Sequence, residues 1–248
     1  MVKLVNLVYC EILKLKRCKI FTLSLLSALV APLMISGEII KSKLDNPEKI
    51  VTFAQLFEST NLYIMMLFGL VLYGVIAAYL ISREYSENTL KSIITVPIPK
   101  ISFIFSKFIT LFIWIILLTF ISWIATIVFG YICGAESLRS QDIFTSIKAY
   151  LLGGVFLFLT STPIFFITMY SKNIIAPIIF MISVVMANFM LSNSDLGVYF
   201  PWTTSYLLVS GVIDKYNTSH LTSYLIIAAT FIFGTIASLI YFEKDDIK

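Results

Sequence analysis

The run FITLFIWIILLTFISWIATIVFGYIC, Phe108–Cys133, contains no charged side chain. About 20 consecutive apolar residues are enough for a helix to cross the roughly 30 Å hydrocarbon core of a bilayer. A helix also satisfies every backbone hydrogen bond within the segment, which lipid requires. The run therefore predicts a membrane-spanning helix.

The rest of the chain has the same character. Of its 248 residues, 59% are hydrophobic and only 13% are charged, with a mean hydropathy of +0.95, whereas about 25% of a soluble domain is charged. Five further uncharged runs are predicted to span the membrane: Ile20–Ser36, Leu62–Ile81, Ala149–Tyr170, Ile174–Leu191 and Leu221–Phe242. We expect an all-α polytopic membrane protein with six transmembrane helices, in which residues 1–248 form one transmembrane domain.

The distribution of Lys and Arg predicts the orientation. Twelve of the 18 basic residues fall in four segments, 1–19, 82–107, 171–173 and 243–248. The other six are spread over a larger number of positions, in 37–61, 134–148 and 192–220. Because cytoplasmic loops carry the excess of Lys and Arg, we expect both termini and the 82–107 loop in the cytoplasm.

Residues 1–19 form the pattern of an amphipathic helix. Its polar stripe consists of Lys3, Asn6, Cys10, Lys14 and Arg17. Its apolar face consists of Leu4, Leu7, Val8, Ile12 and Leu15. Such a helix rests on the anionic inner leaflet, and the basic residues expected at that surface are Lys3, Lys14, Lys16 and Arg17. The alternative, which is compatible with this one, is a plain topology signal.

The outer segment 192–220 contains VYFPWTTSYLLVSGVI, which is aromatic and half apolar but is interrupted by Pro201. One interpretation is a re-entrant or interfacial hairpin, and the other is an ordinary outer loop packed on the bundle. In the first, amphipathic rings would lie at headgroup depth and could contact cargo or act as a gate. The rings in question are Tyr199, Phe200, Trp202 and Tyr206.

Several motifs are missing from the sequence. It has no GxxxxGK[ST], HExxH or GxSxG pattern and no paired carboxylates within a predicted span. We therefore expect no catalytic site, no metal site and no cofactor in this chain. Uncharged spans also argue against an ion-coupled carrier, although backbone carbonyls could still hold sodium. Asn188, the most polar side chain in any predicted span, is expected to hydrogen-bond across helices.

The cytoplasmic stretch REYSENTLKSIITVPIPK, Arg83–Lys100, predicts a short helix of its own. Ser86 is suited to cap it, Glu87 favours its positive N-terminal end, and Pro97 ends it before Pro99 opens the next helix. One face is apolar, with Leu90, Ile93 and Ile94. Because so short a helix is not stable alone in water, it should be covered by a partner protein or by the chain's own spans.

The sequence from Arg83 to Phe108 resembles a loop of the permease subunits of type-2 ABC exporters. The matching residues are Glu84, Glu87, Thr89, Leu90, Pro97, Lys100 and Lys107. Asn88 departs from the pattern, because the family usually has glycine there, but Asn tolerates unusual backbone angles. The resemblance implies a coupling helix that docks into a cytoplasmic ATPase through Glu84, Glu87, Asn88, Thr89, Leu90, Ile93 and Pro97.

The start YCEILKLKRCKIF, Tyr9–Phe21, resembles the N-terminal connecting helix of the same family, most closely in the lantibiotic-immunity and bacitracin-resistance transporters. This implies a bacterial cell-membrane permease with a partner ATPase dimer, which would hold the ATP and Mg²⁺. It also implies a second permease chain, identical or homologous, and an antimicrobial peptide as cargo. One alternative is the same machine exporting another drug, a lipid or an ion. A second is an ion-coupled carrier or a non-transport membrane scaffold.

Overall fold

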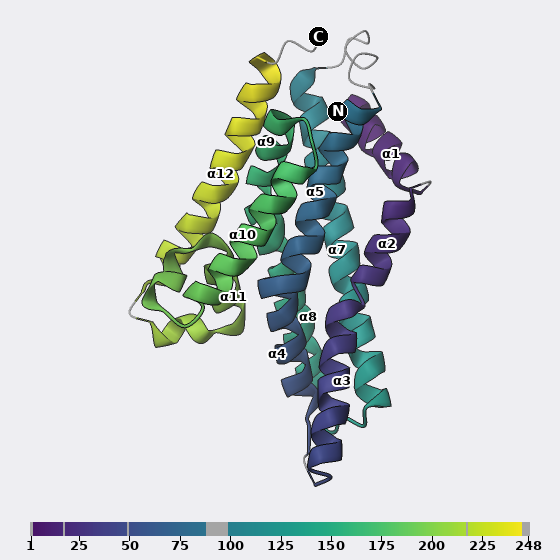
Figure 1. Ribbon diagram of the computed structural model, residues 1–248, viewed down its shortest axis with the longest axis vertical. Helices are drawn as coiled ribbons and strands as arrows, with labels where there is room; N and C mark the ends of the chain where they lie inside the picture. Colours follow the sequence, from purple (N-terminus) through teal and green to yellow (C-terminus); the bar gives the residue numbers. More distant parts are fainter. Residues whose placement is uncertain (1, 17, 49, 88–98, 217, 245–248) are drawn as a thin grey trace.

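The computed structural model describes residues 2–16, 18–48, 50–87, 99–216 and 218–244. Long helices run side by side along the longest axis (Figure 1). One end carries α1, the C-terminal ends of α5 and α12 and the start of α7, and we call it the α1 end. The other end carries the α3–α4 and α7–α8 connections, and we call it the far end.

The first half of the chain contains α1 (Val2–Lys16), α2 (Lys19–Ser27), α3 (Val30–Asp45), α4 (Phe53–Tyr63), the π-helix η1 (Ile64–Phe68), α5 (Gly69–Ser86) and α7 (Lys100–Ile132). The second half contains α8 (Ser140–Thr160), α9 (Thr162–Ser171), α10 (Ile175–Leu191), the 3₁₀ turn η2 (Asp195–Tyr199), α11 (Pro201–Ser210), the 3₁₀ turn η3 (Val212–Lys215) and α12 (His220–Lys244).

The expectation of an all-helical membrane protein is confirmed. Five helical stretches are long and apolar enough to cross a membrane: Lys19–Asp45, Phe53–Ser86, Lys100–Ile132, Ser140–Ser171 and His220–Lys244. The shorter α10, with 17 residues, is also apolar. Each of the five long stretches extends beyond the uncharged run that predicted it at one or both ends, because polar turns continue the helix outside the apolar part.

The extension of α5 corrects the interpretation of Ser86. This residue is the last of α5, and its hydroxyl donates to the carbonyl of Arg83 at 3.0 Å. The prediction that Ser86 caps a separate helix is therefore wrong. The uncharged run ends at Ile81, but the helix continues because the charged residues that follow, Arg83 and Glu84, find partners inside the protein.

The break between α2 and α3 is stabilised from α7. Pro32 lies in the first turn of α3 and has no N–H to donate to the carbonyl of Ala28, four residues earlier. Ser122 of α7 donates its hydroxyl to that carbonyl at 2.6 Å. The Ser122 hydroxyl thus replaces the missing backbone N–H within the membrane, where no water is present to donate to the carbonyl.

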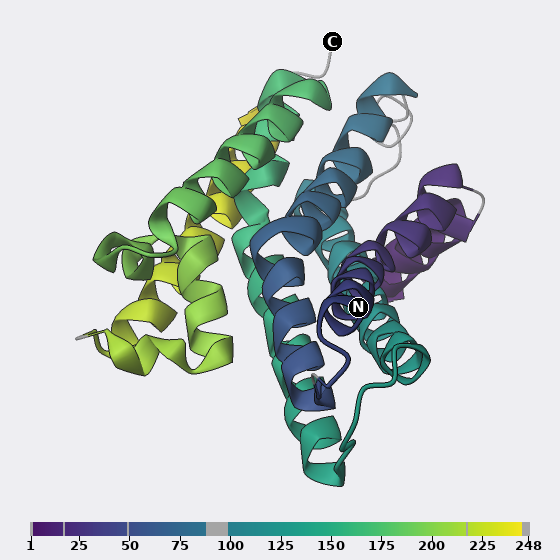
Figure 2. The same cartoon turned by 60° about the horizontal axis from the view of Figure 1, so that its bottom comes forward.

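The segment α4–η1–α5 is the most buried of the long helical stretches. It stands between α9–α12 on one side and α1–α3 on the other (Figure 2). Its π turn interrupts the regular backbone ladder, and there Asn188 of α10 donates to the carbonyl of Met66 at 3.3 Å. Thr203 of α11 donates to the Oδ1 of Asn188 at 2.8 Å. The expected hydrogen bond of Asn188 across helices is confirmed.

Replacing Asn188 by leucine is expected to lower the free energy of unfolding by about 1–3 kcal/mol, because the Met66 carbonyl and the Thr203 hydroxyl lose a buried partner. The midpoint of thermal unfolding in lipid nanodiscs measures this. Ser183→Ala is the control on the same helix, since Ser183 is exposed. Equal midpoints for the two variants would show that the Asn188 amide contributes nothing.

Candidate functional site

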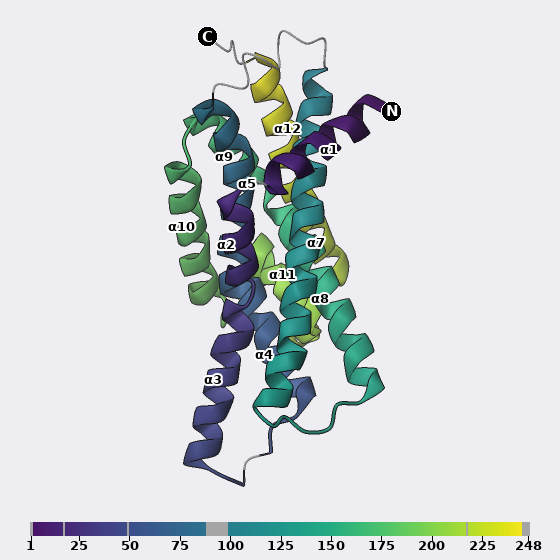
Figure 3. The same cartoon turned by 90° about the vertical axis from the view of Figure 1, so that its right-hand side faces the viewer.

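Five charged side chains meet between α1, α5 and α7 near the α1 end. They are Glu11, Lys14, Arg83, Glu84 and Lys107, and we call them the ionic cluster. In Figure 3, α1 crosses obliquely over α7 while α2 and α3 continue along the bundle. The cluster thus joins the N-terminal helix to two helices that follow much later in the chain.

Lys107 is the centre of the ionic cluster. Its side chain is completely buried, its Nζ lies 2.7 Å from Glu11 Oε2, and it also contacts Glu84 Oε1. Lys14 Nζ bridges the same two carboxylates, at 3.0 Å from Glu11 Oε1 and 3.1 Å from Glu84 Oε1. Arg83 Nη2 adds longer contacts of 3.4 Å to Glu11 and 3.7 Å to Glu84.

Three cations and two carboxylates balance most of the charge inside the cluster. Ions this buried carry a large desolvation penalty, and only close pairing offsets it. Burial acts to lower the pKa of Lys14, but the carboxylates of Glu11 and Glu84 outweigh it, so its pKa lies above its ordinary value. A cation with a raised pKa stabilises the fold below that ordinary value, so Lys14 contributes at neutral pH.

The ionic cluster lies at the base of the loop for which the coupling helix is predicted. Arg83 and Glu84 occupy the last turn of α5, which Glu87 ends as an exposed C-cap residue. Pro99 begins α7 as its N-cap, as predicted. Lys107 lies seven residues after Lys100, the first residue of α7, which is about 10 Å along the helix. The ion pairs between Lys107 and Glu84 therefore hold together the two helices that carry the loop.

Most of the predicted docking residues lie outside the described part of the chain. These are Asn88, Thr89, Leu90, Ile93 and Pro97. Glu87 lies at the exposed end of α5, whereas Glu84 is only 1% exposed and its carboxylate points into the ionic cluster. In this structure Glu84 is placed to position the loop rather than to present a surface to a partner.

The α1 helix turns most of its predicted apolar face toward the protein, since Leu4, Leu7 and Val8 are partly buried. Leu15 is 5% exposed and belongs to the core, but Ile12, expected on the same face, is 40% exposed. The reason is Glu11, whose carboxylate must point inward to reach Lys107. The apolar side chains that face outward are Val5, Tyr9, Ile12 and Leu13.

The four basic residues predicted for the membrane surface differ in position. Lys14 belongs to the ionic cluster, and Lys16 is exposed. The side chains of Lys3 and Arg17 lie outside the described part of the chain. A membrane-surface role for α1 stays a prediction, with Lys16 and the outward apolar side chains available for it.

The four predicted outer aromatic residues are not equivalent. Trp202 is 7% exposed and packs against Phe180 and Phe200, with ring centroids 5.9 and 5.2 Å away. Tyr206 is half-buried and faces a cavity between α4, α8 and α11. Tyr199 is 59% exposed. Tyr199, Tyr206 and the partly exposed Phe200 are therefore better placed than Trp202 to meet a ligand from outside the protein.

Comparison with known sequences places this architecture in a family. A sequence model of the family described as ABC-2 family transporter protein matches residues 7–188, which include the whole ionic cluster. The chain belongs to the ABC-2 transporter family. It is 39% identical over 202 residues to the bacitracin transport permease protein BCRB of Bacillus licheniformis, covering 81% of this chain and 96% of that protein.

Membership of the ABC-2 family confirms the resemblance inferred from the loop and from the N-terminal helix. It makes the chain a multi-pass membrane permease and implies a separate ATPase partner, as in ABC transporters of this family. It also weighs against an ion-coupled carrier or a non-transport scaffold.

The role of Glu11 was missed by the sequence analysis, although the sequence holds a signal for it. Glu11 is the only acidic residue among the first 37, and Lys14 follows it at the i+3 spacing of a helix. Burying a single carboxylate on a basic, apolar helix costs less free energy when a buried cation pairs with it. The identity of that cation, Lys107, depends on tertiary structure.

Proposed function

We propose that this ABC-2 permease is the membrane subunit of a bacterial exporter that expels bacitracin or a similar antimicrobial peptide and so confers resistance. The observation that supports this most strongly is the identity to a bacitracin transport permease over nearly the whole of that protein. An ATPase dimer would supply the energy and would hold ATP and Mg²⁺. A second permease chain, identical or homologous, would complete the assembly.

The proposed topology has six spans and both termini in the cytoplasm. The start of α1 and the end of α12 lie at the same end of the bundle (Figure 1), which requires an even number of crossings. The short α10 then joins the five long helical stretches as a sixth span, since a predominantly apolar helix of 17 residues is at the lower limit for crossing. The excess of Lys and Arg supports a cytoplasmic location for the α1 end.

In the proposed mechanism, closure of the ATPase pulls on residues 88–98, and the ionic cluster transmits the motion. Glu84 and Lys107 tie α5 to α7, and Glu11 ties both to α1. These three helices would then move as one body, which carries the movement of a short loop into the membrane. Packed elements held by buried ion pairs move between discrete arrangements rather than deforming gradually.

We also propose that the outer segment η2–α11–η3 re-enters the outer leaflet. Thr203 of α11 bonds to Asn188, which bonds to Met66, and both of these partners lie within expected spans. In Figure 1 the segment stands at about mid-height of the bundle, well short of the far end. A cargo taken from the outer leaflet would meet this segment first.

Deleting the gene tests the proposed cargo. Deletion is expected to raise sensitivity to bacitracin, and a plasmid copy should restore resistance. Lantibiotics, a small-molecule drug and a lipid-export assay serve as parallel cargoes. Unchanged sensitivity to bacitracin and lantibiotics would remove the peptide proposal and favour another drug, a lipid or an ion. A permease that purifies without any ATPase would contradict the proposed assembly.

A further inference from the structure

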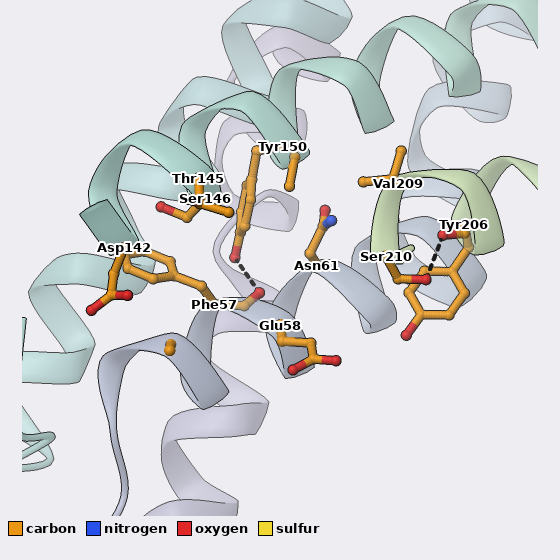
Figure 4. A pocket seen from close by; sticks show the side chains of 12 residues that line it. Phe57, Glu58, Asn61, Asp142, Thr145, Ser146, Tyr150, Tyr206, Val209 and Ser210 are labelled. Atoms are coloured by element: carbon orange, nitrogen blue, oxygen red, sulfur yellow. Dashed lines mark hydrogen bonds between the residues drawn. The ribbon is translucent and has the colours of Figure 1, made fainter. Parts of the chain in front are cut away.

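A cavity of about 300 Å³ opens between α4, α8 and α11 in the far half of the bundle (Figure 4). Its apolar walls are the rings of Phe57, Tyr150 and Tyr206, with Ala54, Ala149 and Val209 between them. Most of its α4 and α8 residues precede the apolar runs that begin at Leu62 and Ala149. In the proposed orientation the cavity therefore lies at the outer edge of the membrane.

Asn61 shows that the cavity is suited to a polar ligand. Its side chain is 6% exposed, lines the cavity and forms no hydrogen bond with any described residue. Its amide atoms are not sealed from solvent, so the cavity leaves them open to a hydrogen-bond partner. Proteins keep such groups where water or a ligand completes their hydrogen bonding.

The charge of the lining is negative. Glu58 and Asp142 line the cavity, neither forms an ion pair with another described residue, and the lining contains no Lys or Arg. Asp142 Oδ2 accepts only from the backbone N–H of Arg139, at 3.2 Å. Burial, with the carboxylate of Glu58 nearby, raises the pKa of Tyr206, so its phenol stays neutral. The two carboxylates thus favour a cation over a neutral guest.

The walls distinguish between kinds of cation. Aromatic rings attract an ammonium group through their π faces and also pack against methylene groups. An inorganic ion has no methylene groups to pack against these rings. The volume is at the lower limit for a ligand pocket, which suits one side chain rather than a whole peptide. These features together fit a primary ammonium on a short aliphatic stem.

We propose that this cavity binds a primary ammonium group on an aliphatic stem. Resting on the proposed function, we further assign that group to a basic side chain of the exported peptide. Glu58 and Asp142 would attract the ammonium at the mouth, and the Asn61 carbonyl oxygen would accept its hydrogen bond inside. The rings of Phe57 and Tyr206 would enclose the stem.

The charge preference of the cavity can be measured without any cargo. The full-length chain, with its ATPase, is placed in nanodiscs after Cys10, Cys18 and Cys133 are replaced by serine, and Ser210→Cys is introduced. The probes are 2-aminoethyl methanethiosulfonate, a primary ammonium, and its neutral methyl analogue. We expect Glu58→Gln to lower the ratio of their rates by about fivefold, as for one unit charge about 4 Å away in water.

The control for this measurement is Glu48→Gln, which removes an exposed carboxylate at the turn between α3 and α4. It should leave the rate ratio unchanged. The ammonium site would be contradicted if Glu58→Gln left the ratio of reagent rates unchanged. It would also be contradicted if Glu48→Gln lowered that ratio by the same factor as Glu58→Gln. This result does not depend on what the transporter exports.

Bacitracin then tests the link to cargo. We expect it to protect the cysteine at position 210 from the neutral reagent. We also expect Glu58→Gln and Asn61→Leu to lose resistance in cells while Glu48→Gln keeps it. If the wild type itself gives no bacitracin resistance, the proposal that bacitracin is the cargo is wrong. The ratio of reagent rates alone then tests whether the cavity binds an ammonium group. If the wild type gives resistance, two results together would show that the cavity does not bind the cargo. Both variants would keep full resistance, and bacitracin would not protect the cysteine at position 210. The proposed exporter function would still stand.

Discussion

Replacing Lys107 by methionine is expected to destabilise the folded permease by about 3–5 kcal/mol, the usual cost of removing one partner from a buried ion pair. Methionine keeps the length of the stem, so little packing is lost. The carboxylates of Glu11 and Glu84, 5% and 2% exposed, would remain buried. Among the described residues, Arg83, at 3.4 Å or more, and Lys14 would remain to pair with them. A drop in the thermal midpoint in nanodiscs measures the effect.

Lys100→Met is the matched control for Lys107→Met. Lys100 lies on the same helix but is exposed, and its Nζ donates to the carbonyls of Phe242 and Glu243 at 3.4 and 3.1 Å. Exposed charges typically contribute about 0–1 kcal/mol. A double-mutant cycle of Lys107→Met with Glu84→Gln should also give a coupling energy above about 0.5 kcal/mol. Equal midpoints for Lys107→Met and Lys100→Met would show that the ionic cluster does not support the fold.

The substitution Leu90→Asp is expected to lower bacitracin-stimulated ATP turnover of the purified complex by a factor on the order of thirty. A residue at the centre of an interface contributes about 2 kcal/mol or more, and a carboxylate in an apolar groove adds a desolvation penalty. Glu87→Ala should act in the same direction. The assay compares turnover with and without bacitracin, together with the amount of ATPase that co-purifies.

Lys91→Ala is the control for Leu90→Asp, since Lys91 lies about 100° around the predicted coupling helix from Leu90 and off its apolar face. It should leave stimulated turnover within a few-fold of the wild type. The thermal midpoint of Leu90→Asp should also stay unchanged, because the proposal assigns Leu90 to the docking loop and not to the packed core. Full stimulation of ATP turnover in Leu90→Asp would remove the docking assignment, whatever the cargo proves to be.

The sequence predicted where the membrane helices lie but not where they end. An uncharged run such as Leu62–Ile81 marks the part of a helix that lipid surrounds, because charges are costly there. The helix itself continues from Phe53 to Ser86, since backbone hydrogen bonding does not stop where polarity begins. Capping signals near a span are ambiguous for that reason, and Ser86 is an example.

The ionic cluster could not be predicted as a unit, because its members come from three distant segments. The family resemblance singled out Glu84 and Lys107 separately and assigned only Glu84 to the docking surface. Only tertiary structure shows that their side chains meet and that Glu11 joins them. The partners of Asn188 were equally hidden, since a π turn leaves no pattern that hydrophobic periodicity detects.

The central claim is that residues 88–98 are held against a cytoplasmic ATPase, and site-specific photo-crosslinking tests it most directly. A photoreactive residue is placed at position 90 or, as the control, at position 59, an exposed position of α4 in the far half. The account predicts that irradiating whole cells joins the permease to the ATPase from position 90 and not from position 59. No adduct from position 90, or an adduct from position 59, would contradict it.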